Sequence, residues 1–228
     1  NLKSEANKTI NFSDWEAERQ KIKTSKQEIN KLIFNYLILE ANQEAVEEFE
    51  KESGQTIEYD KELLSKRSEI RKLLLKGSID KAINLVNDID ENILENNKNL
   101  NFELLKLKLV EMIKLNNIEE AIRFAQQSLF PIALHDEKNL SELKKLMLLL
   151  IYDDLSSSPF KDVISDNYVK SVISCINIEI LKSRLQCFHP SLQIMVKLMK
   201  WSQKELKDCG VDYPEISEVT PLKYSKKS

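Results

Sequence analysis

Glycine and proline are scarce in this chain of 228 residues, which has three glycines and five prolines. Sheets joined by tight turns need both residues far more often, because glycine supplies positive φ angles and proline fixes φ in turns. Leucine, lysine, glutamate and isoleucine are abundant instead, and few helix breakers among many helix formers favour helices. The composition therefore predicts an all-α protein without strands.

A charge of one predominant sign is also missing. The chain has 34 Lys and Arg against 37 Asp and Glu, a net charge of −3 and a pI near 5.7. A nucleic-acid-binding surface normally carries a strong basic excess, so this balance argues against one. Apolar runs are short as well: the longest, residues 146–152, is far too short to span a bilayer. No segment has the pattern of a signal peptide.

The residues that usually carry chemistry are few. The three cysteines, Cys175, Cys187 and Cys209, form no CxxC pair, and the two histidines, His135 and His189, have no second ligand at metal-binding spacing. Glycine-rich phosphate loops and GxSxG motifs are absent. We therefore expect no metal, no cofactor and no catalysis, and we expect the cysteines to be small buried apolar residues. An uncharacterised helical enzyme is the alternative of a different class, which a tightly bound ligand or metal would favour.

Two short helices over residues 29–53 carry a continuous apolar stripe. Its members recur at i, i+3, i+4, i+7 and i+8, as on one face of an amphipathic helix: Ile29, Leu32, Ile33, Tyr36 and Leu37. The second helix places Phe49 inward and ends at Gly54, a residue suited to a left-handed helix end. A hairpin of this size needs a partner, either the last helix of the same chain or another molecule, and both can hold.

Further helical hairpins follow. Gly77 and the pair Asn116-Asn117 mark tight corners between helices, residues 102–115 form a strongly apolar helix, and Pro131 should end the helix that begins after Asn117.

The remaining segments complete an antiparallel array of roughly nine to eleven helices. The Asn-rich stretch 91–101 is expected to be a loop, and residues 140–152 a central buried helix. The last long helix runs from Ser191 through Trp201, and the tail 211–228 is expected to be loosely ordered.

These residues also match a known pattern. Residues 29–37, followed by Phe49 and Gly54, resemble a LisH motif. Residues 67–83, with Arg67, Ile70 and Leu74, resemble the start of a CTLH domain. Residues 102–126, with Phe124, resemble its second half. Residues 142–160 and 191–206, with Leu198 and Trp201, resemble a CRA domain. Three such motifs in this order identify the chain as a member of the LisH–CTLH–CRA family.

The resemblance has boundaries and departures. It implies a single elongated helical unit with an N-terminal segment and first helix (1–25), LisH (26–58), CTLH (59–130), CRA (131–210) and a tail (211–228). Ala41 stands where LisH motifs often have glycine, so the turn must be made without it. Leu107 stands where the second CTLH helix often has glutamine, which bears on one partner contact.

The short form of the chain, without SPRY, WD40 or RING-like modules, implies a non-catalytic scaffold subunit of a GID/CTLH-type E3 ubiquitin ligase. The implied role is to bridge RanBPM-like, armadillo-repeat and RING-bearing subunits, in the cytoplasm and nucleus, for proteasomal degradation. The runner-up is a LisH-type dimerisation adaptor in a cytoskeletal or transcription-linked complex. The isolated chain is expected to self-associate, because its apolar stripes lack their partners. The expected interface residues are Ile29, Leu32, Ile33, Tyr36, Leu37, Phe49, Arg67, Ile70, Leu74, Phe124, Leu198 and Trp201.

Overall fold

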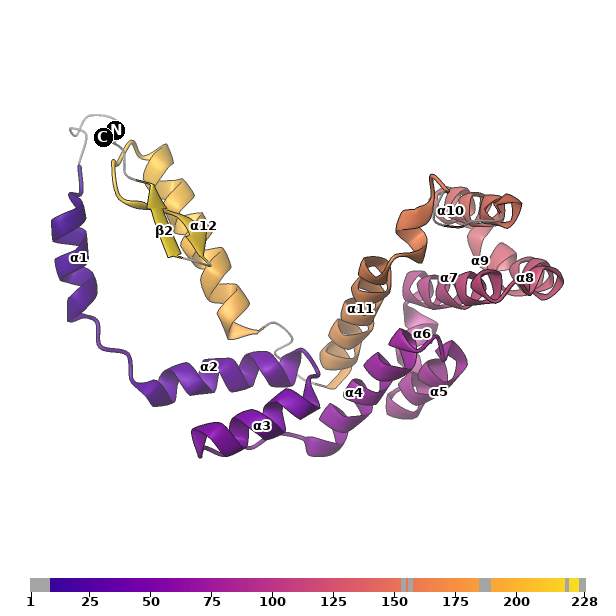
Figure 1. Ribbon diagram of the computed structural model, residues 1–228, viewed down its shortest axis with the longest axis horizontal. Coiled ribbons are helices and arrows are strands. Elements are labelled where there is room, and N and C mark those ends of the chain that lie inside the picture. Colours follow the sequence, from indigo (N-terminus) through magenta and orange to yellow (C-terminus); the bar gives the residue numbers. More distant parts are fainter. Residues whose placement is uncertain (1–8, 153–154, 156–157, 185–189, 220–221, 226–228) are drawn as a thin grey trace. The chain divides into compact units, whose positions relative to one another are not determined.

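The computed structural model describes residues 9–152, 155, 158–184, 190–219 and 222–225, and the predicted all-α class is confirmed (Figure 1). The chain forms two compact units. Unit 1 comprises Asn1–Tyr36 and His189–Ser228, and unit 2 comprises Leu37–Phe188. The expectation of a single helical unit is therefore wrong. The reason is that two long segments of unit 1 contribute no buried residue, so they do not join the core of unit 2.

Unit 1 combines helices from both ends of the chain with one hairpin. Its elements are α1 (Phe12–Lys21), most of α2 (Lys26–Leu39), α12 (Ser191–Asp208), β1 (Glu215–Val219) and β2 (Leu222–Ser225). The two strands pair antiparallel, with a bulge between Ile216 and Glu218. The expectation of a loosely ordered tail without strands is wrong in these residues. The hairpin lies along α12 (Figure 1), where the hydroxyl of Tyr213 donates a hydrogen bond of 2.7 Å to the carbonyl of Gln203.

Unit 2 is an array of short antiparallel helices. Its elements are α3 (Gln43–Ser53), α4 (Lys61–Leu75), α5 (Ile79–Ile89), α6 (Asn92–Asn96), α7 (Lys98–Lys114), α8 (Ile118–Phe124), the π-helix η1 (Ala125–Leu129), α9 (Phe130–Ala133), α10 (Glu137–Leu148), the 3₁₀ helices η2 (Leu149–Ile151) and η4 (Lys161–Ile164), and α11 (Asp166–Arg184).

Three corners of the array share one backbone conformation. Ala41, Gly77 and Asn116 adopt left-handed φ angles of 55°, 72° and 60°. At each corner, the amide of the next residue donates to the carbonyl five residues earlier, as Ser78 N–H does to Leu73 O at 2.9 Å, which is a Schellman motif. The corners predicted at Gly77 and Asn116 are confirmed. Ala41 makes the LisH turn in the same way, although a left-handed alanine costs about 1–2 kcal/mol.

Most of the buried apolar residues of unit 2 form two hydrophobic clusters that share α7. The first cluster joins α4, α5, α6, α7 and α11, and it contains Ile70, Leu74, Val86, Leu104 and Ile176 among others. The second joins α7 to α8, η1, α9 and α10, and it contains Phe102, Leu109, Ala121, Leu129 and Leu146 among others. Helix α7 therefore has apolar side chains on two faces, one for each cluster.

Three local expectations are wrong. Pro131 does not end its helix, because the wider π-turn over Ala125–Leu129 precedes it and the helix continues to Ala133. The Asn-rich stretch forms α6 and the first turn of α7, where Asn97 caps α7 by accepting the Leu100 amide at 3.0 Å. The segment 140–152 is buried on one side only: Leu146 is 1% exposed, whereas Ile151 is 75% exposed.

Candidate protein-interaction surface

Helix α12 carries an apolar stripe that is exposed in the described part of unit 1. Ile194, Leu198 and Trp201 follow each other at i, i+4 and i+7, and therefore lie on one side of the helix. Leu198 and Trp201 are each 57% exposed, and none of the eighteen residues of α12 is buried. Exposed apolar patches of this kind mark interaction sites. We call Ile194, Met195, Leu198 and Trp201 the α12 stripe.

The other side of α12 is the one that contacts its own unit. Val196, Met199, Gln203 and Leu206 are partly buried there. The Gln203 amide donates to the carbonyl of Ile216 in β1 at 3.3 Å. The hairpin thus occupies one side of α12 and leaves the α12 stripe on another.

The predicted LisH stripe is half-exposed. Ile29 is 46% exposed, and Leu32, Ile33, Tyr36 and Leu37 are partly buried. The buried residues of α2 are Asn30, Phe34 and Leu39, and none of them belongs to the predicted stripe. Sequence reasoning missed these three, because α2 is apolar on more than one side.

Unit 2 exposes a second group of apolar side chains on and around α8, α9 and α10. On α8 and the corner before it, Leu115, Ile118 and Ile122 lie at i, i+3 and i+7, with exposures of 70%, 42% and 37%. The second group continues over α9, α10 and η2, with exposed Phe130, Leu134, Leu148 and Ile151. We call these seven residues the α8–α10 patch.

Phe124 and Phe49, two further candidates, are partly buried. The Lys108 ammonium lies 5.0 Å from the centre of the Phe124 ring and 2.6 Å from an Asp80 carboxylate oxygen. Lys108 therefore covers part of Phe124 and joins α7 to α5 and α8.

Arg67, Ile70 and Leu74 lie in the interior of unit 2, with exposures of 4%, 2% and 2%. The Arg67 guanidinium donates to the carbonyls of Ile38 and Leu39 at 2.8 and 3.2 Å and to Asn177 Oδ1 at 2.9 Å. These carbonyls are the orphan acceptors at the end of α2, where a positive charge is favourable. Burial lowers the pKa of Arg67 to about 10. The three residues are thus not available on the surface of unit 2.

A second buried charge joins α7, α10 and α11. Lys106 is 3% exposed and pairs with the carboxylates of Glu103, at 3.1 Å, and Glu142. Its ammonium also lies 5.0 Å from the centre of the Tyr168 ring, and the Tyr168 hydroxyl bonds to Glu103. Burial and the Glu103 carboxylate raise the pKa of Tyr168, so its phenol stays neutral. No sequence signal distinguished Lys106 from the many exposed lysines.

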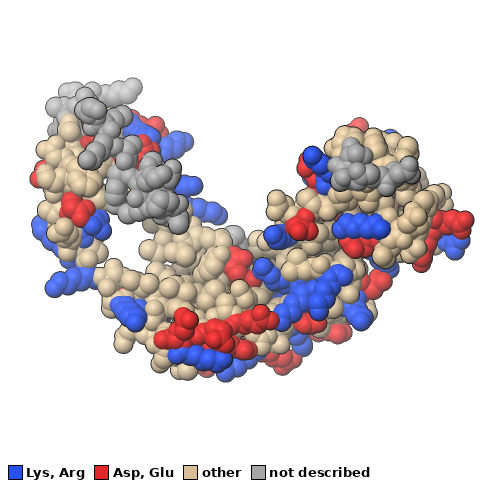
Figure 2. Space-filling view, viewed as in Figure 1, with Lys and Arg blue, Asp and Glu red and all other residues tan. Residues whose placement is uncertain are grey.

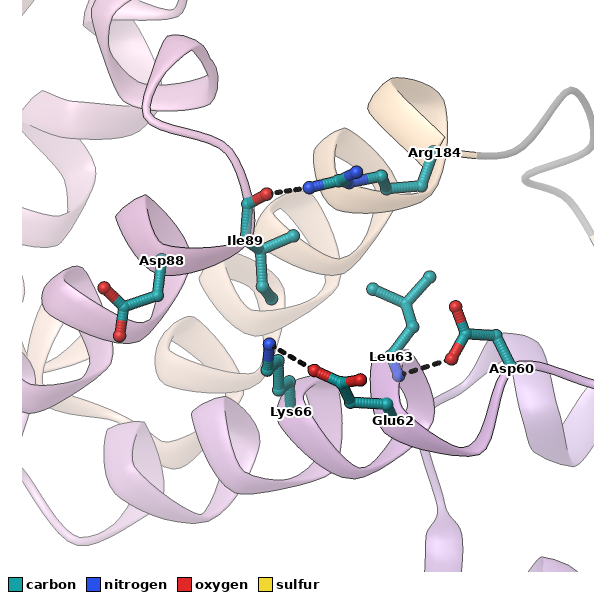
Figure 3. Close-up of a pocket in the computed structure, with 7 residues that line it drawn as sticks. All are labelled: Asp60, Glu62, Leu63, Lys66, Asp88, Ile89 and Arg184. Carbon is teal, nitrogen blue, oxygen red and sulfur yellow. Dashed lines mark hydrogen bonds and ion pairs between the residues drawn. The ribbon is translucent and has the colours of Figure 1, made fainter.

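A small pocket lies between α4, the end of α5 and the end of α11 (Figure 3). Its volume is about 210 Å³, below the range of about 300–1,000 Å³ that is usual for ligand sites. Lys66 pairs with Glu62 at 2.7 Å, Asp60 caps the Leu63 amide at 2.9 Å, and Arg184 donates to the carbonyl of Ile89. These polar groups therefore serve the structure of unit 2.

The chemically active side chains do not converge. Among the described residues, no group of three His, Cys, Asp or Glu could hold a metal ion. Cys175 and Cys209 are exposed, so the expectation that they are buried is wrong; Cys175 lies beside the buried stripe of α11 rather than in it. Partial burial and the carboxylates of Glu103 and Glu179 raise the pKa of the Cys175 thiol. Cys187 and His189 lie outside the described residues.

The surface also carries charged side chains of both signs. Acidic and basic side chains are interspersed over the face in view in Figure 2, as expected for solvated helices. In the part of the chain that the structure describes, no helix is both long and apolar enough to cross a membrane.

Comparison with known proteins now decides the family. A family model described as the CTLH/CRA C-terminal to LisH motif domain matches residues 63–207, which is more than half of the chain. This chain belongs to that family. The match covers most of unit 2 and nearly all of α12, so both the α8–α10 patch and the α12 stripe lie within the family's domain.

Relatives extend the match to almost the whole chain. The glucose-induced degradation protein 8 homolog of Dictyostelium discoideum is 34% identical over 95% of each chain. The protein GID8 homolog of Arabidopsis thaliana is 33% identical over 93% of this chain and 87% of its own. The GID complex subunit 8 of Schizosaccharomyces pombe is 29% identical over 92% and 91%. A Ran-binding proteins 9/10 homolog of Drosophila melanogaster is 34% identical over 43% of this chain and 10% of its own.

Proposed function

We propose that this chain is a non-catalytic scaffold subunit of a multi-subunit GID/CTLH-type E3 ubiquitin ligase. Its role would be to bridge RanBPM-like, armadillo-repeat and RING-bearing subunits. The observation that carries the proposal is α12, an eighteen-residue helix with an uncovered apolar stripe and no buried residue. A helix of this kind is typical of an interface.

The existence of a second apolar surface supports a bridge rather than a simple dimer. The α12 stripe belongs to unit 1 and the α8–α10 patch to unit 2. A protein that joins two different subunits needs two such surfaces. Interfaces of this kind draw affinity from buried aromatic and aliphatic side chains, and charges at the rim set partner choice. The LisH residues on α2, from Ile29 to Leu37, would extend the first surface.

The names of the relatives support the choice of complex. The S. pombe relative is named as a subunit of the GID complex, and two others are named as GID8 or glucose-induced degradation protein 8 homologues. The scarcity of converging catalytic groups in the described residues fits a subunit that transfers nothing itself. The cytoplasmic and nuclear location stays a prediction from the resemblance.

The test is affinity capture of the tagged chain from its native cells at moderate salt, with the recovered proteins identified by mass spectrometry. We expect a RING-bearing CTLH protein, a SPRY-bearing RanBPM-like protein and an armadillo-repeat protein. Variants Trp201→Asp and Ile122→Asp should each lose one class of subunit and keep the other, because burying an unpaired charge disrupts only the interface that contains it. Lys200→Ala, on the polar side of α12, is the matched control.

Recovery of none of these subunits by a well-expressed bait would overturn the proposal. Tubulin-linked or chromatin proteins in their place would favour the adaptor function instead. Loss of every subunit with either variant would contradict two separate surfaces.

A further inference from the structure

The described part of unit 1 has almost no buried interior. Its buried apolar side chains are Phe34 and Pro190. The other buried apolar side chains of the described residues lie in unit 2, most of them in its two clusters. Because burial of apolar surface is the main favourable term in folding, unit 1 lacks most of what stabilises a folded domain.

Each element of unit 1 is also marginal when taken alone. Helix α1 has ten residues and none of them is buried. Isolated helices shorter than about 12–15 residues are barely stable in water. Helix α12 is longer, at eighteen residues, but it too has no buried residue. The two-stranded hairpin β1–β2 belongs to a class that needs packing against another element.

The polar contacts within unit 1 do not replace a core. The Ser191 amide donates to Asn35 Oδ1 at 2.9 Å, which joins the start of α12 to α2. The Lys207–Glu215 ion pair, at 2.6 Å, joins α12 to the hairpin, and the lysine side chain is 54% exposed. Exposed ion pairs contribute little, because solvent screens them and two long side chains must be ordered.

We propose that unit 1 becomes fully folded only when another subunit covers the α12 stripe, whereas unit 2 is folded beforehand. The inference rests on the proposed function for its partner, a subunit of the same family. It adds that binding and folding of unit 1 are one event. In the unbound chain, α1 and α12 unfold and refold rapidly. Binding of the partner subunit holds both helices in the folded state. Unit 1 would therefore be folded in the assembled chain and largely unfolded in the unassembled one.

The chemistry of α12 defines the surface that would cover it. Lys197, Lys204 and Glu205 lie at i−4, i+3 and i+4 from Trp201, beside the α12 stripe. A complementary surface is therefore an apolar helix face with charges of both signs at its rim, because opposite charges around an apolar centre align and select partners.

The test is amide hydrogen exchange of the full-length chain, read by mass spectrometry at a concentration where sedimentation shows a monomer. We expect the amides of α12 to exchange within about tenfold of an unstructured peptide and those of α7 at least about 1,000-fold more slowly, since local opening tracks local stability. The RanBPM-like subunit from the same cells is then added at about 100 times its dissociation constant. Exchange of α12 should slow about 100-fold by mass action, and exchange of α7 should not change.

Two variants sharpen the result. Trp201→Ser should abolish the slowing in α12 without changing α7, and Lys200→Ala should leave the slowing intact. Protection of α12 in the monomer equal to that of α7 would overturn the inference. Binding without slowing of α12 would also overturn it and leave the proposed function standing. If the added subunit does not bind, the proposed partner fails, while fast exchange of α12 in the monomer still supports the inference.

Discussion

Replacement of Arg67 by methionine should destabilise unit 2 by about 1 kcal/mol. The substitution keeps most of the side-chain volume but leaves Asn177 Oδ1 without its Arg67 donor, and an orphaned buried acceptor costs about 1–3 kcal/mol. The Ile38 carbonyl loses the shorter of two hydrogen bonds, at about 0.5–1.5 kcal/mol, and keeps the Ala41 amide at 3.2 Å. The Leu39 carbonyl keeps one donor, since Asn177 Nδ2 reaches it at 2.7 Å. Loss of a positive charge at the end of α2 adds about 0.3–2 kcal/mol.

A relief of desolvation opposes these losses. Burial lowers the pKa of Arg67 from its ordinary value to about 10, and each pKa unit corresponds to about 1.4 kcal/mol. Removal of the guanidinium therefore offsets on the order of 3 kcal/mol of these losses. The remaining difference is the modest net decrease in the free energy of unfolding.

Arg71→Met is the matched control. Arg71 lies one turn later on α4, is only partly buried, and makes one long hydrogen bond of 3.4 Å to the Glu40 carbonyl. Its substitution should change stability by less than about 0.5 kcal/mol. The assay is urea unfolding followed by circular dichroism, with an unchanged dependence on urea showing that both variants unfold in the same way. Arg67→Met that is as stable as Arg71→Met would refute the reasoning.

Four further predictions test other contacts. Gly77→Ala and Gly54→Ala should each lower stability by about 1–2 kcal/mol, because both positions have φ above +60°. Only at Gly77 would the new methyl group also contact the Glu111 side chain of α7. Gly77→Ala should therefore have the lower melting temperature of the two in calorimetry. Lys106→Met should cost about 3 kcal/mol in urea unfolding, since two carboxylates lose their buried partner; a neutral result would show that solvent already compensates them. Alkylation of Cys175 by iodoacetamide at pH 8 should be slower than that of a cysteine peptide, because its raised pKa lowers the thiolate fraction; equal rates would contradict this. The isolated chain should self-associate at tens of micromolar, and Trp201→Ser should weaken this in sedimentation; a monodisperse native chain at that concentration would be the contrary result.

The corners and the apolar helices could be predicted from the sequence because local rules decide them. A left-handed residue followed by Ser or Asn ends one helix and begins the next, and this was visible at Gly77 and Asn116. The periodicity of α5 likewise places Ala82 and Val86 inside.

The buried charges and the hairpin could not be predicted, because distant segments determine them. Arg67 is buried only because the end of α2 and Asn177 supply acceptors. The strands need α12 beside them, and Gln203 meets Ile216 only in the folded unit. Of the candidate interface residues, the sequence identified Leu198 and Trp201 as apolar positions on one helix, but whether a residue of that helix is buried depends on the whole fold.

The first hydrophobic cluster of unit 2 has a consequence for how the chain can change in evolution. Val172, Ile173, Ile176 and Ile180 of α11, which fall in the segment expected to be CRA, pack against α4, α5 and α7 of the segment expected to be CTLH. The two names therefore divide the sequence but not the cooperative structure. Exchange of only one segment between family members would bring together side chains that do not pack in the first cluster. Recombination is therefore tolerated only where the CTLH and CRA segments are exchanged together.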